Sequence, residues 1–229
     1  MTPIQFGRIA TPLAAAMVLA AAGAAAPSNA EERDAPLVPI TAIAPGRAGT
    51  HIILLITGEA GKTEFEFALA RELAATGSGV LILDAKAYLG TPKSPSRAAT
   101  ESEEPLRRYA KVWNRPRVVV VGYSRGADIA PFIANRLSTD LRQQLDGVVL
   151  LGPAGRASFE LTIREAVTKR PRATDLPVMP ELERLRGTRL LCAYGRQEPA
   201  PFCSRVDSTL MHVVARAGGH KLAQADGKP

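Results

Sequence analysis

The stretch RVVVVGYSRGADIA, residues 117–130, joins a strongly apolar run to a helical pattern through a tight turn. Four consecutive valines are typical of a strand buried on both faces of a parallel sheet. The turn has the sequence GYSRG over residues 122–126, a G-x-S-x-G motif in the strand-turn-helix context of a nucleophile elbow. We expect a strained backbone at Ser124, with glycines where larger side chains would collide with the neighbouring strand or helix. The alternative is an ordinary turn in which Ser124 caps the helix.

Short apolar runs alternate with helical patterns along the chain, which indicates an α/β fold with a mostly parallel sheet covered by helices on both faces. The 229 residues, 46% of them hydrophobic, suffice for the core of one domain, expected over residues 31–229. Residues 155–185 break the alternation with three prolines and are expected to be an insertion over the strand ends, where substrate-selecting structure is common. Strands are expected near residue 39 and at 51–57, 79–84, 117–122, 147–152, 189–194 and 212–217.

Three helices are predicted between these strands. The first follows Thr63, which opens a T-x-x-E capping box. The second covers about 101–114, with Pro105 in or near its first turn. The third covers 127–137, where Pro131 should kink the helix or shift its start.

A serine nucleophile needs a base, and the chain has only three histidines, His51, His212 and His220. In the chain order of α/β-hydrolases the base comes last, after the acid. His220 follows the last expected strand in ARAGGHK and is therefore the predicted base. His212 is its rival, and the simpler interpretation of His212 is a strand histidine with no special role.

The acid that orients the base should follow the penultimate strand. Glu198 lies three residues after the glycine that ends RLLCAYG, so we predict that Glu198 is this acid. A solvated loop glutamate is the alternative. Asp128, two residues past the G-x-S-x-G motif, is a second candidate, although its simpler role is to complement the N-terminal dipole of its own helix.

The two cysteines, Cys192 and Cys203, stand eleven positions apart on either side of Glu198. In an oxidising compartment we expect them to form one disulfide, which would brace the loop that carries Glu198. Their wide spacing, with no histidine nearby, argues against a zinc site. Neither a metal nor an organic cofactor is implied by the sequence.

The segment GEAGKT, residues 58–63, sits between a predicted strand and a predicted helix, as a phosphate-binding loop would. It is two residues shorter than the G-x-x-x-x-G-K-[ST] loop that wraps a nucleotide phosphate, so nucleotide binding is a poor alternative. In an α/β-hydrolase this position supplies one N–H of the oxyanion hole, and the residue after the nucleophile supplies the other. The predicted donors are the backbone N–H groups of Glu59 and Arg125. Lys62 is expected to be a solvated helix-start lysine, with an anionic head group as the less favoured partner.

The first thirty residues carry one charge, Arg8, ahead of a long alanine-rich run that closes with small residues. This pattern predicts a secretory signal peptide over residues 1–30, cleaved after Ala26 or Ala30, and hence a periplasmic protein. A retained membrane anchor over residues 9–26 is the alternative, disfavoured because a run of mostly alanine is weakly hydrophobic.

The net charge is +7, and removal of residues 1–30 lowers it by one. An exported basic protein meets anionic lipid or cell-wall polymer sooner than nucleic acid. The sequence has no block of Lys and Arg with interleaved aromatics, which is the pattern that indicates a nucleic-acid surface. Solubility alone is the simpler explanation of the charge.

Four segments resemble, in the same order, the VirJ family of bacterial virulence-associated periplasmic proteins, which includes the AcvB proteins. They begin with HIILLITGEAGKT, VVVVGYSRGADIAPF, LLCAYGRQEP and GGH, and together they extend over most of the chain after the signal. The resemblance implies an α/β-hydrolase fold, export, association with type IV secretion in some members, and hydrolysis of aminoacylated phosphatidylglycerol in the AcvB branch. Ser124, Glu198 and His220 fall on the family's serine motif, YG-x-x-E loop and GGH.

The chain departs from the family pattern at three places that concern activity: the glycine-rich loop, position 200, and the segment after His220. There the family usually has another His and a closing helix, whereas nine residues follow His220 in this sequence. GEAGKT replaces a loop close to SGDGGW, and Ala200 stands where the family often has an Asp two places after the loop Glu. The leading hypothesis is a periplasmic serine hydrolase that cleaves an ester, with the aminoacyl ester of an anionic phospholipid as the candidate substrate. The alternative is an accessory protein of an export machine that kept the fold and lost the chemistry.

Overall fold

The computed structural model describes residues 38–162 and 172–222 of the chain. The signal peptide expected over residues 1–30 lies outside this part. Within the described residues, no helix is long and apolar enough to cross a membrane.

A seven-stranded sheet forms the centre of the fold, and each strand corresponds to one predicted from an apolar run. The spatial order is β1-β3-β2-β4-β5-β8-β9, in which β1 pairs antiparallel with β3 at one edge and every other pairing is parallel. The mostly parallel sheet predicted from the sequence is therefore confirmed. The strands are β1 (Ile40–Ile43), β2 (His51–Ile56), β3 (Gly79–Leu83), β4 (Arg117–Tyr123), β5 (Leu145–Leu151), β8 (Arg189–Gly195) and β9 (His212–Arg216).

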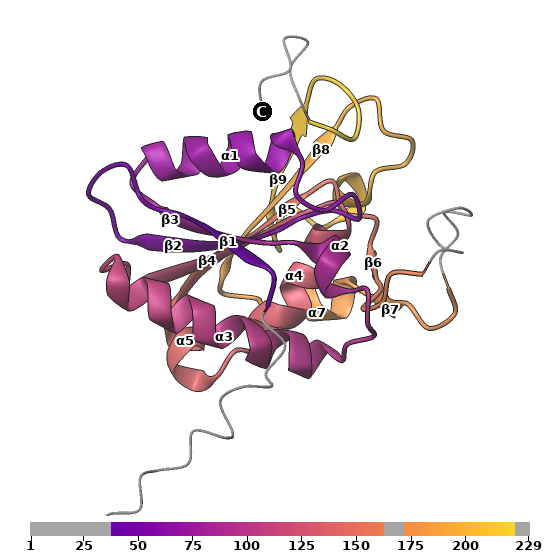
Figure 1. Ribbon diagram of the computed structural model, residues 1–229. Helices are drawn as coiled ribbons and strands as arrows, with labels where there is room; N and C mark the ends of the chain where they lie inside the picture. The colour runs from indigo at the N-terminus through magenta and orange to yellow at the C-terminus, as the bar shows by residue number, and fades with distance from the viewer. Residues whose placement is uncertain (1–37, 163–171, 223–229) are drawn as a thin grey trace, which may run out of the picture. The chain divides into compact units, whose positions relative to one another are not determined.

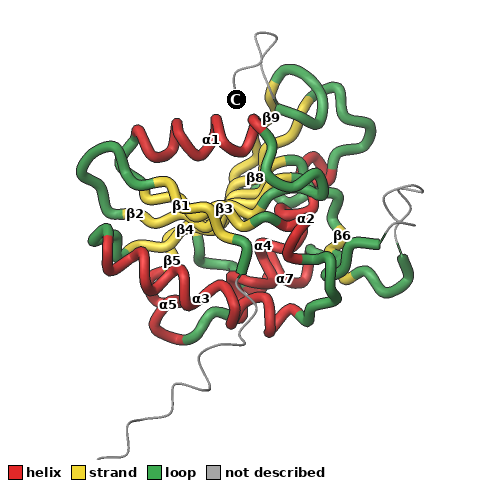
Figure 2. Tube along the Cα trace, viewed as in Figure 1, coloured by secondary structure: helices red, strands yellow, loops and turns green. Residues whose placement is uncertain are grey.

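Helices cover both faces of the sheet. In Figure 1, α1 lies on one face, while α3, α4, α5 and α7 lie on the other. Figure 2 shows the same arrangement by element type. The helices are α1 (Glu64–Ala75), α2 (Ala85–Tyr88), α3 (Pro95–Val112), α4 (Arg125–Arg136), α5 (Thr139–Gln144) and α7 (Met179–Arg184).

The central strands are buried on both faces because their side chains alternate between two apolar clusters. Ile52 and Leu54 of β2 belong to the larger cluster with α3, α4 and α7. Ile53 and Leu55 belong to the smaller cluster with α1. This explains the unbroken apolar runs in the sequence, since each consecutive residue meets one helical layer or the other.

The second predicted helix was wrong at its start. Helix α3 begins at Pro95, because Ser94 caps it by accepting the N–H of Arg97 at 3.1 Å and proline is favourable in the first turn. Pro105 therefore lies inside α3, not in its first turn. Helix α4 likewise continues through Pro131 and begins directly after Ser124.

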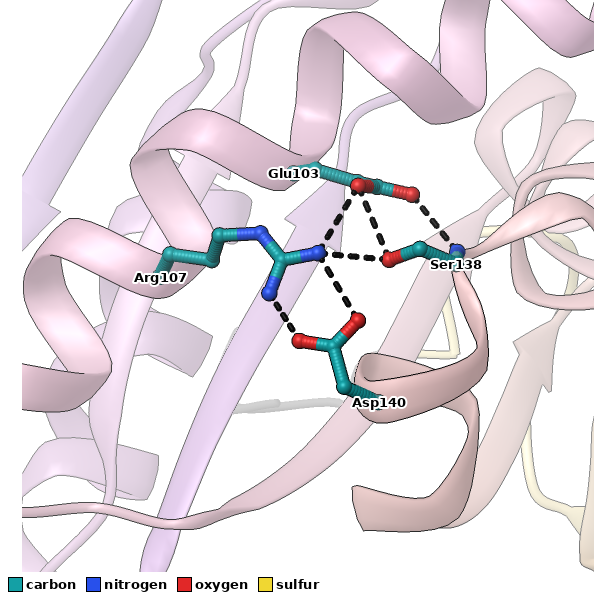
Figure 3. A network of polar contacts seen from close by, with 4 residues as sticks. All are labelled: Glu103, Arg107, Ser138 and Asp140. Atoms are coloured by element: carbon teal, nitrogen blue, oxygen red, sulfur yellow. Dashed lines mark hydrogen bonds and ion pairs between the residues drawn. The ribbon is translucent and has the colours of Figure 1, made fainter.

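A polar network at the surface joins α3 to the start of α5 (Figure 3). Arg107 donates to both carboxylate oxygens of Asp140, while Glu103 accepts the backbone N–H of Ser138 at 2.6 Å and its hydroxyl at 2.9 Å. The Arg107 guanidinium holds the pKa of Asp140 well below its usual range. The network thereby fixes the chain at the turn between α4 and α5.

The segment predicted as an insertion leaves the sheet after β5 and returns at β8. Its described part contains a short hairpin, β6 (Arg156–Ala157) with β7 (Leu176–Pro177), followed by α7. The buried Glu181 anchors α7 to α4 by accepting from Arg136 at 3.0 Å and from Asn135 at 2.7 Å. Burial opposes ionisation of Glu181, but these partners hold its pKa below the usual value.

Candidate active site

Loops that follow four parallel strands meet at the carboxyl edge of the sheet, where ligand sites of open α/β sheets lie. The loop after β2 brings Glu59, the turn after β4 brings Ser124, and the loops after β8 and β9 bring Glu198 and His220. Direct hydrogen-bond contacts connect all four side chains. Residues far apart in the sequence thus form one polar cluster.

Ser124 stands at a strained turn between β4 and α4. Its φ of 52° and ψ of −118° lie outside the regions that residues with a β-carbon favour, as expected for a nucleophile elbow. Although Ser124 occupies the N-cap position of α4, its side chain makes no capping hydrogen bond. Its hydroxyl oxygen instead lies 2.9 Å from Nε2 of His220. The geometry therefore disagrees with the interpretation of Ser124 as a helix cap.

The two glycines of the motif allow the elbow to form against the sheet. A β-carbon at Gly122 would lie 2.2 Å from the carbonyl oxygen of Gly126. One at Gly126 would lie 2.2 Å from the carbonyl oxygen of Ile56 in β2. Both separations are below any contact that a real β-carbon makes, so these positions admit only glycine without movement of the backbone.

His220 is held between Ser124 and Glu198. Its Nδ1 lies 3.0 Å from Oε2 of Glu198, and a carboxylate at this nitrogen favours the tautomer in which Nδ1 carries the proton. Nε2 is then an acceptor facing the Ser124 hydroxyl. The ring also lies over Gly152, where a β-carbon would come within 3.0 Å of Cε1 of His220.

Glu198 is positioned by its own turn and by a disulfide. One carboxylate oxygen accepts the N–H of Gly195 at 2.7 Å, and the other faces His220. Cys192 in β8 and Cys203 in the short 3-10 helix η1 (Phe202–Arg205) form the predicted disulfide, which is therefore confirmed. Both cysteines are buried, so the base of the Glu198 loop is fixed on the sheet.

Removal of the disulfide is expected to lower the free energy of unfolding by about 2–3 kcal/mol, because the crosslink closes a short loop and restricts the unfolded chain. Replacing both cysteines by alanine and measuring urea denaturation checks this. Reduction of the wild-type protein should give the same loss. An unchanged denaturation midpoint in the double variant would contradict the structural role of the bond.

The glycine-rich loop after β2 brings Glu59 against the elbow. A β-carbon at Gly58 would lie 3.3 Å from Cβ of Ser124, so the loop backbone passes close to this side chain. Arg125 begins α4 directly after Ser124. The two N–H groups predicted for the oxyanion hole therefore belong to segments that meet at Ser124, and their donor role remains a prediction.

Lys62 turns away from the cluster. Its ammonium donates to Thr41 of β1 at 3.0 Å and lies 4.0 Å from the carboxylate of Asp84. The loop therefore directs its lysine to the sheet edge beside β3. In a phosphate-binding loop the lysine would reach the bound phosphates instead.

Asp128 does not reach the histidine. Its buried carboxylate accepts the N–H of Gly155 at 2.7 Å and that of Ala154 at 3.2 Å, which ties the loop after β5 to helix α4. Burial raises the pKa of Asp128 to about 7, although these hydrogen bonds oppose the shift. Its contacts indicate a structural role.

The other two histidines lie away from Ser124. His51 and His212 begin β2 and β9, at the amino ends of parallel strands and hence at the opposite edge of the sheet. Nε2 of His51 lies 2.8 Å from the carboxylate of Asp146. The hydrogen bonds from His51 and Arg117 lower the pKa of Asp146 to about 2. Of the three histidines, the structure brings only His220 to the elbow.

An aromatic ring separates the elbow from α1. The ring of Tyr123 packs 4.7 Å from that of Phe65 and 5.6 Å from the imidazole of His220. Burial raises the pKa of the Tyr123 hydroxyl to about 12, with smaller contributions from the charges of Glu66, Glu59 and Glu198. The carboxylates of Glu66, Glu59 and Glu198 therefore act together on the Tyr123 hydroxyl.

Sequence reasoning missed two features of this cluster. It considered only the backbone of Glu59, whereas the Ser124 hydroxyl donates to the Glu59 carboxylate at 3.2 Å. It also gave no role to Gly152, on which the imidazole packs. Neither feature has a local sequence signal, because each depends on strands that are adjacent only in space.

Comparison with known proteins gives a family and a fold. The chain matches the family model described as "Bacterial virulence protein (VirJ)" over residues 50–227. No curated protein matches the sequence.

Several solved structures are similar to the chain. Est1E from Butyrivibrio proteoclasticus is 16% identical, with a TM-score of 0.58 over 81% of this chain and 86% of that chain. A "probable hydrolytic enzyme" from Pseudomonas aeruginosa PAO1 is 16% identical, with a TM-score of 0.56 over 79% and 83%. A thermostable carboxyl esterase from Bacillus coagulans is 13% identical, with a TM-score of 0.54 over 79% and 84%. At such identities the likeness concerns the fold, which is that of the α/β-hydrolases.

Proposed function

The chain belongs to the VirJ family of bacterial virulence proteins, and from this premise we propose that it is a serine hydrolase that cleaves an ester. The observation that carries the proposal is the continuous hydrogen-bonded relay from Ser124 through His220 to Glu198, with distances of 2.9 and 3.0 Å. Such a relay, on a strained turn after a central strand, is the arrangement that activates a serine hydroxyl.

In the proposed reaction, Oγ of Ser124 attacks the ester carbonyl while Nε2 of His220 accepts its proton. The imidazolium then gives that proton to the departing alcohol, and water releases the acyl group by the reverse sequence. Glu198 stabilises the imidazolium through Nδ1. The N–H groups of Glu59 and Arg125 would hold the oxyanion as its charge develops.

For the substrate, we propose the aminoacyl ester of phosphatidylglycerol, as the likeness to the AcvB branch suggests. Three exposed cations lie near Glu198 and His220: Arg196 and Lys221 in the loops that carry these residues, and Arg216 at the end of β9. The N–H of Arg196 donates to the carbonyl of Arg216 at 2.9 Å, which keeps the two loops together. Within the described part of the chain, none of the three has a carboxylate partner. They would suit the phosphate of an anionic phospholipid.

A periplasmic location is part of this proposal. The pattern of residues 1–30 favours export, and a disulfide between Cys192 and Cys203 suits an oxidising compartment. For protein partners, we propose that the chain associates with secretion-system proteins, as some family members do.

The competing hypothesis of a non-catalytic accessory protein rested partly on Ala200. In the structure, the carboxylate of Glu198 lies at hydrogen-bond distance from His220. The relay therefore does not need an Asp at position 200. The changed GEAGKT loop remains in favour of that hypothesis.

Labelling with a fluorophosphonate tests the proposal, because this probe reacts with an activated serine. We expect one adduct on Ser124 of the purified protein, located by mass spectrometry, and none in Ser124→Ala. A folded wild-type protein without an adduct would overturn the hydrolase proposal and favour the accessory protein.

A further inference from the structure

The Ser124 hydroxyl faces two acceptors but has a single proton. Nε2 of His220 lies 2.9 Å from Oγ, and Oε2 of Glu59 lies 3.2 Å from it. In attack on an ester the proton must go to His220. A proton shared with Glu59 is therefore withheld from the base.

Glu59 also opposes the charge that the reaction creates. Negative charge develops on the carbonyl oxygen of the substrate after Oγ attacks, and a carboxylate next to Oγ raises the free energy of that state. No positively charged side chain within the described ranges forms an ion pair with Glu59. The nearest lysine in sequence, Lys62, is directed to Thr41 and Asp84. Among the described residues, no side chain thus supplies a counter-charge to Glu59, which leaves this role open to a cation of the substrate.

We infer that Glu59 selects esters whose acyl group carries a cation beside the carbonyl, an inference that rests on the proposed hydrolase function. An ammonium bound to the Glu59 carboxylate frees the serine proton for His220 and cancels the charge that opposes the oxyanion. A neutral acyl group does neither. The side chain of Glu59 is thus a specificity-determining group, distinct from the oxyanion role of its backbone.

The dimensions of the site favour a cation close to the scissile bond. An ammonium hydrogen-bonded to Glu59 lies about 3 Å from the carboxylate oxygen, and a carbonyl carbon in position for attack lies about 3 Å from Oγ. Since the two oxygens are 3.2 Å apart, a nitrogen on the carbon next to the carbonyl reaches Glu59. A 2-amino acyl ester fits this geometry, and its ammonium keeps all its protons throughout the reaction.

A pair of soluble esters of equal shape tests the inference. The methyl esters of alanine and of isobutyric acid differ only by an ammonium in place of a methyl group. At pH 6.5, below the usual α-amino pKa of about 7.7–8.0, the alanine ester is mostly charged. Because the α-ammonium also activates the carbonyl inductively, each kcat/KM is divided by the rate constant for hydroxide-catalysed hydrolysis of the same ester. We expect this normalised wild-type ratio to favour the alanine ester at least about tenfold, and Glu59→Gln to reduce it below about threefold.

The direction of each change separates selection from a structural role. Glu59→Gln should raise kcat/KM for the isobutyrate ester and lower it for the alanine ester, whereas a merely structural residue would change both equally. Glu64→Gln is the matched control, because it removes a neighbouring exposed carboxylate that pairs with Arg71 and not with Ser124. A wild-type ratio near one, or an equal loss on both esters in Glu59→Gln, would overturn the inference.

Labelling rates distinguish this inference from the proposed function. A neutral fluorophosphonate and one carrying a trimethylammonium group both react with an activated serine without turnover. Faster labelling of Ser124 by the cationic probe, lost in Glu59→Gln, supports the inference even if neither methyl ester is hydrolysed. Equal labelling by the two probes would overturn only the inference that Glu59 selects a cation. If neither probe labels Ser124, the proposed hydrolase function itself is overturned.

Discussion

Replacing Ser124 by alanine is expected to lower kcat for ester hydrolysis by roughly 10⁴- to 10⁶-fold while the protein remains folded. The substitution removes the oxygen that attacks the carbonyl and leaves water as the nucleophile. It does not disturb the packing of the elbow, since the Ser124 side chain makes no capping hydrogen bond to α4. Steady-state hydrolysis of a soluble ester, with circular dichroism as the check on folding, measures the effect.

The matched comparison is His220→Ala, alone and combined with Ser124→Ala. If the two residues act as one unit, each single variant should lose about as much activity as the double variant. Additive losses would mean that the 2.9 Å contact between Oγ and Nε2 is not the path of the proton. Residual activity in Ser124→Ala within tenfold of wild type would contradict the nucleophile assignment itself.

Replacing Gly126 by alanine is expected to lower the free energy of unfolding by about 3 kcal/mol or more, and to reduce activity because the elbow must shift. The added methyl group would lie 2.2 Å from the carbonyl oxygen of Ile56 and 2.6 Å from that of Thr57. Neither contact involves a flexible side chain, so relief requires movement of α4 away from β2. Urea denaturation measures the loss, with a midpoint shift of about 1–3 M for a slope near 1–3 kcal/mol/M.

Gly90→Ala is the control for this substitution. A β-carbon at Gly90 meets the carbonyl oxygen of Ala87 at 3.5 Å, an ordinary van der Waals contact. We expect a change of no more than about 0.5 kcal/mol there. Equal free energies of unfolding for the Gly126→Ala and Gly90→Ala variants would show that the close approach of α4 to β2 does not require glycine at position 126.

Element types were predictable because they depend on neighbours in the chain. The valine run predicts strand β4, and the T-x-x-E sequence predicts the start of α1, from neighbouring residues alone. Both elements are present in the structure. The start of α3 was missed, although Ser94 and Pro95 give a clear local signal for it. The N-cap, and not the position of Pro105, marks the start of this helix.

The order of the sheet explains why part of the site could be predicted. Once the strands are parallel, all their carboxyl ends lie at one edge, so residues after β4, β8 and β9 are candidates to meet. The G-x-S-x-G motif and the chain order of α/β-hydrolases predicted Ser124, Glu198 and His220 as a set, and the structure brings them together at this edge. Their catalytic roles still await the experiments above.

The sequence by itself determined the seven strands, the elbow with its two glycines and the pairing of the only two cysteines, because each follows from local pattern or composition. Only the tertiary structure decided that the Glu59 carboxylate faces the serine hydroxyl and that Gly152 makes room for the imidazole. The physical reason is that a side chain's direction is set by packing between segments that are distant in the sequence. The charge balance at Ser124, and with it the substrate preference we propose, is therefore a property of the folded chain.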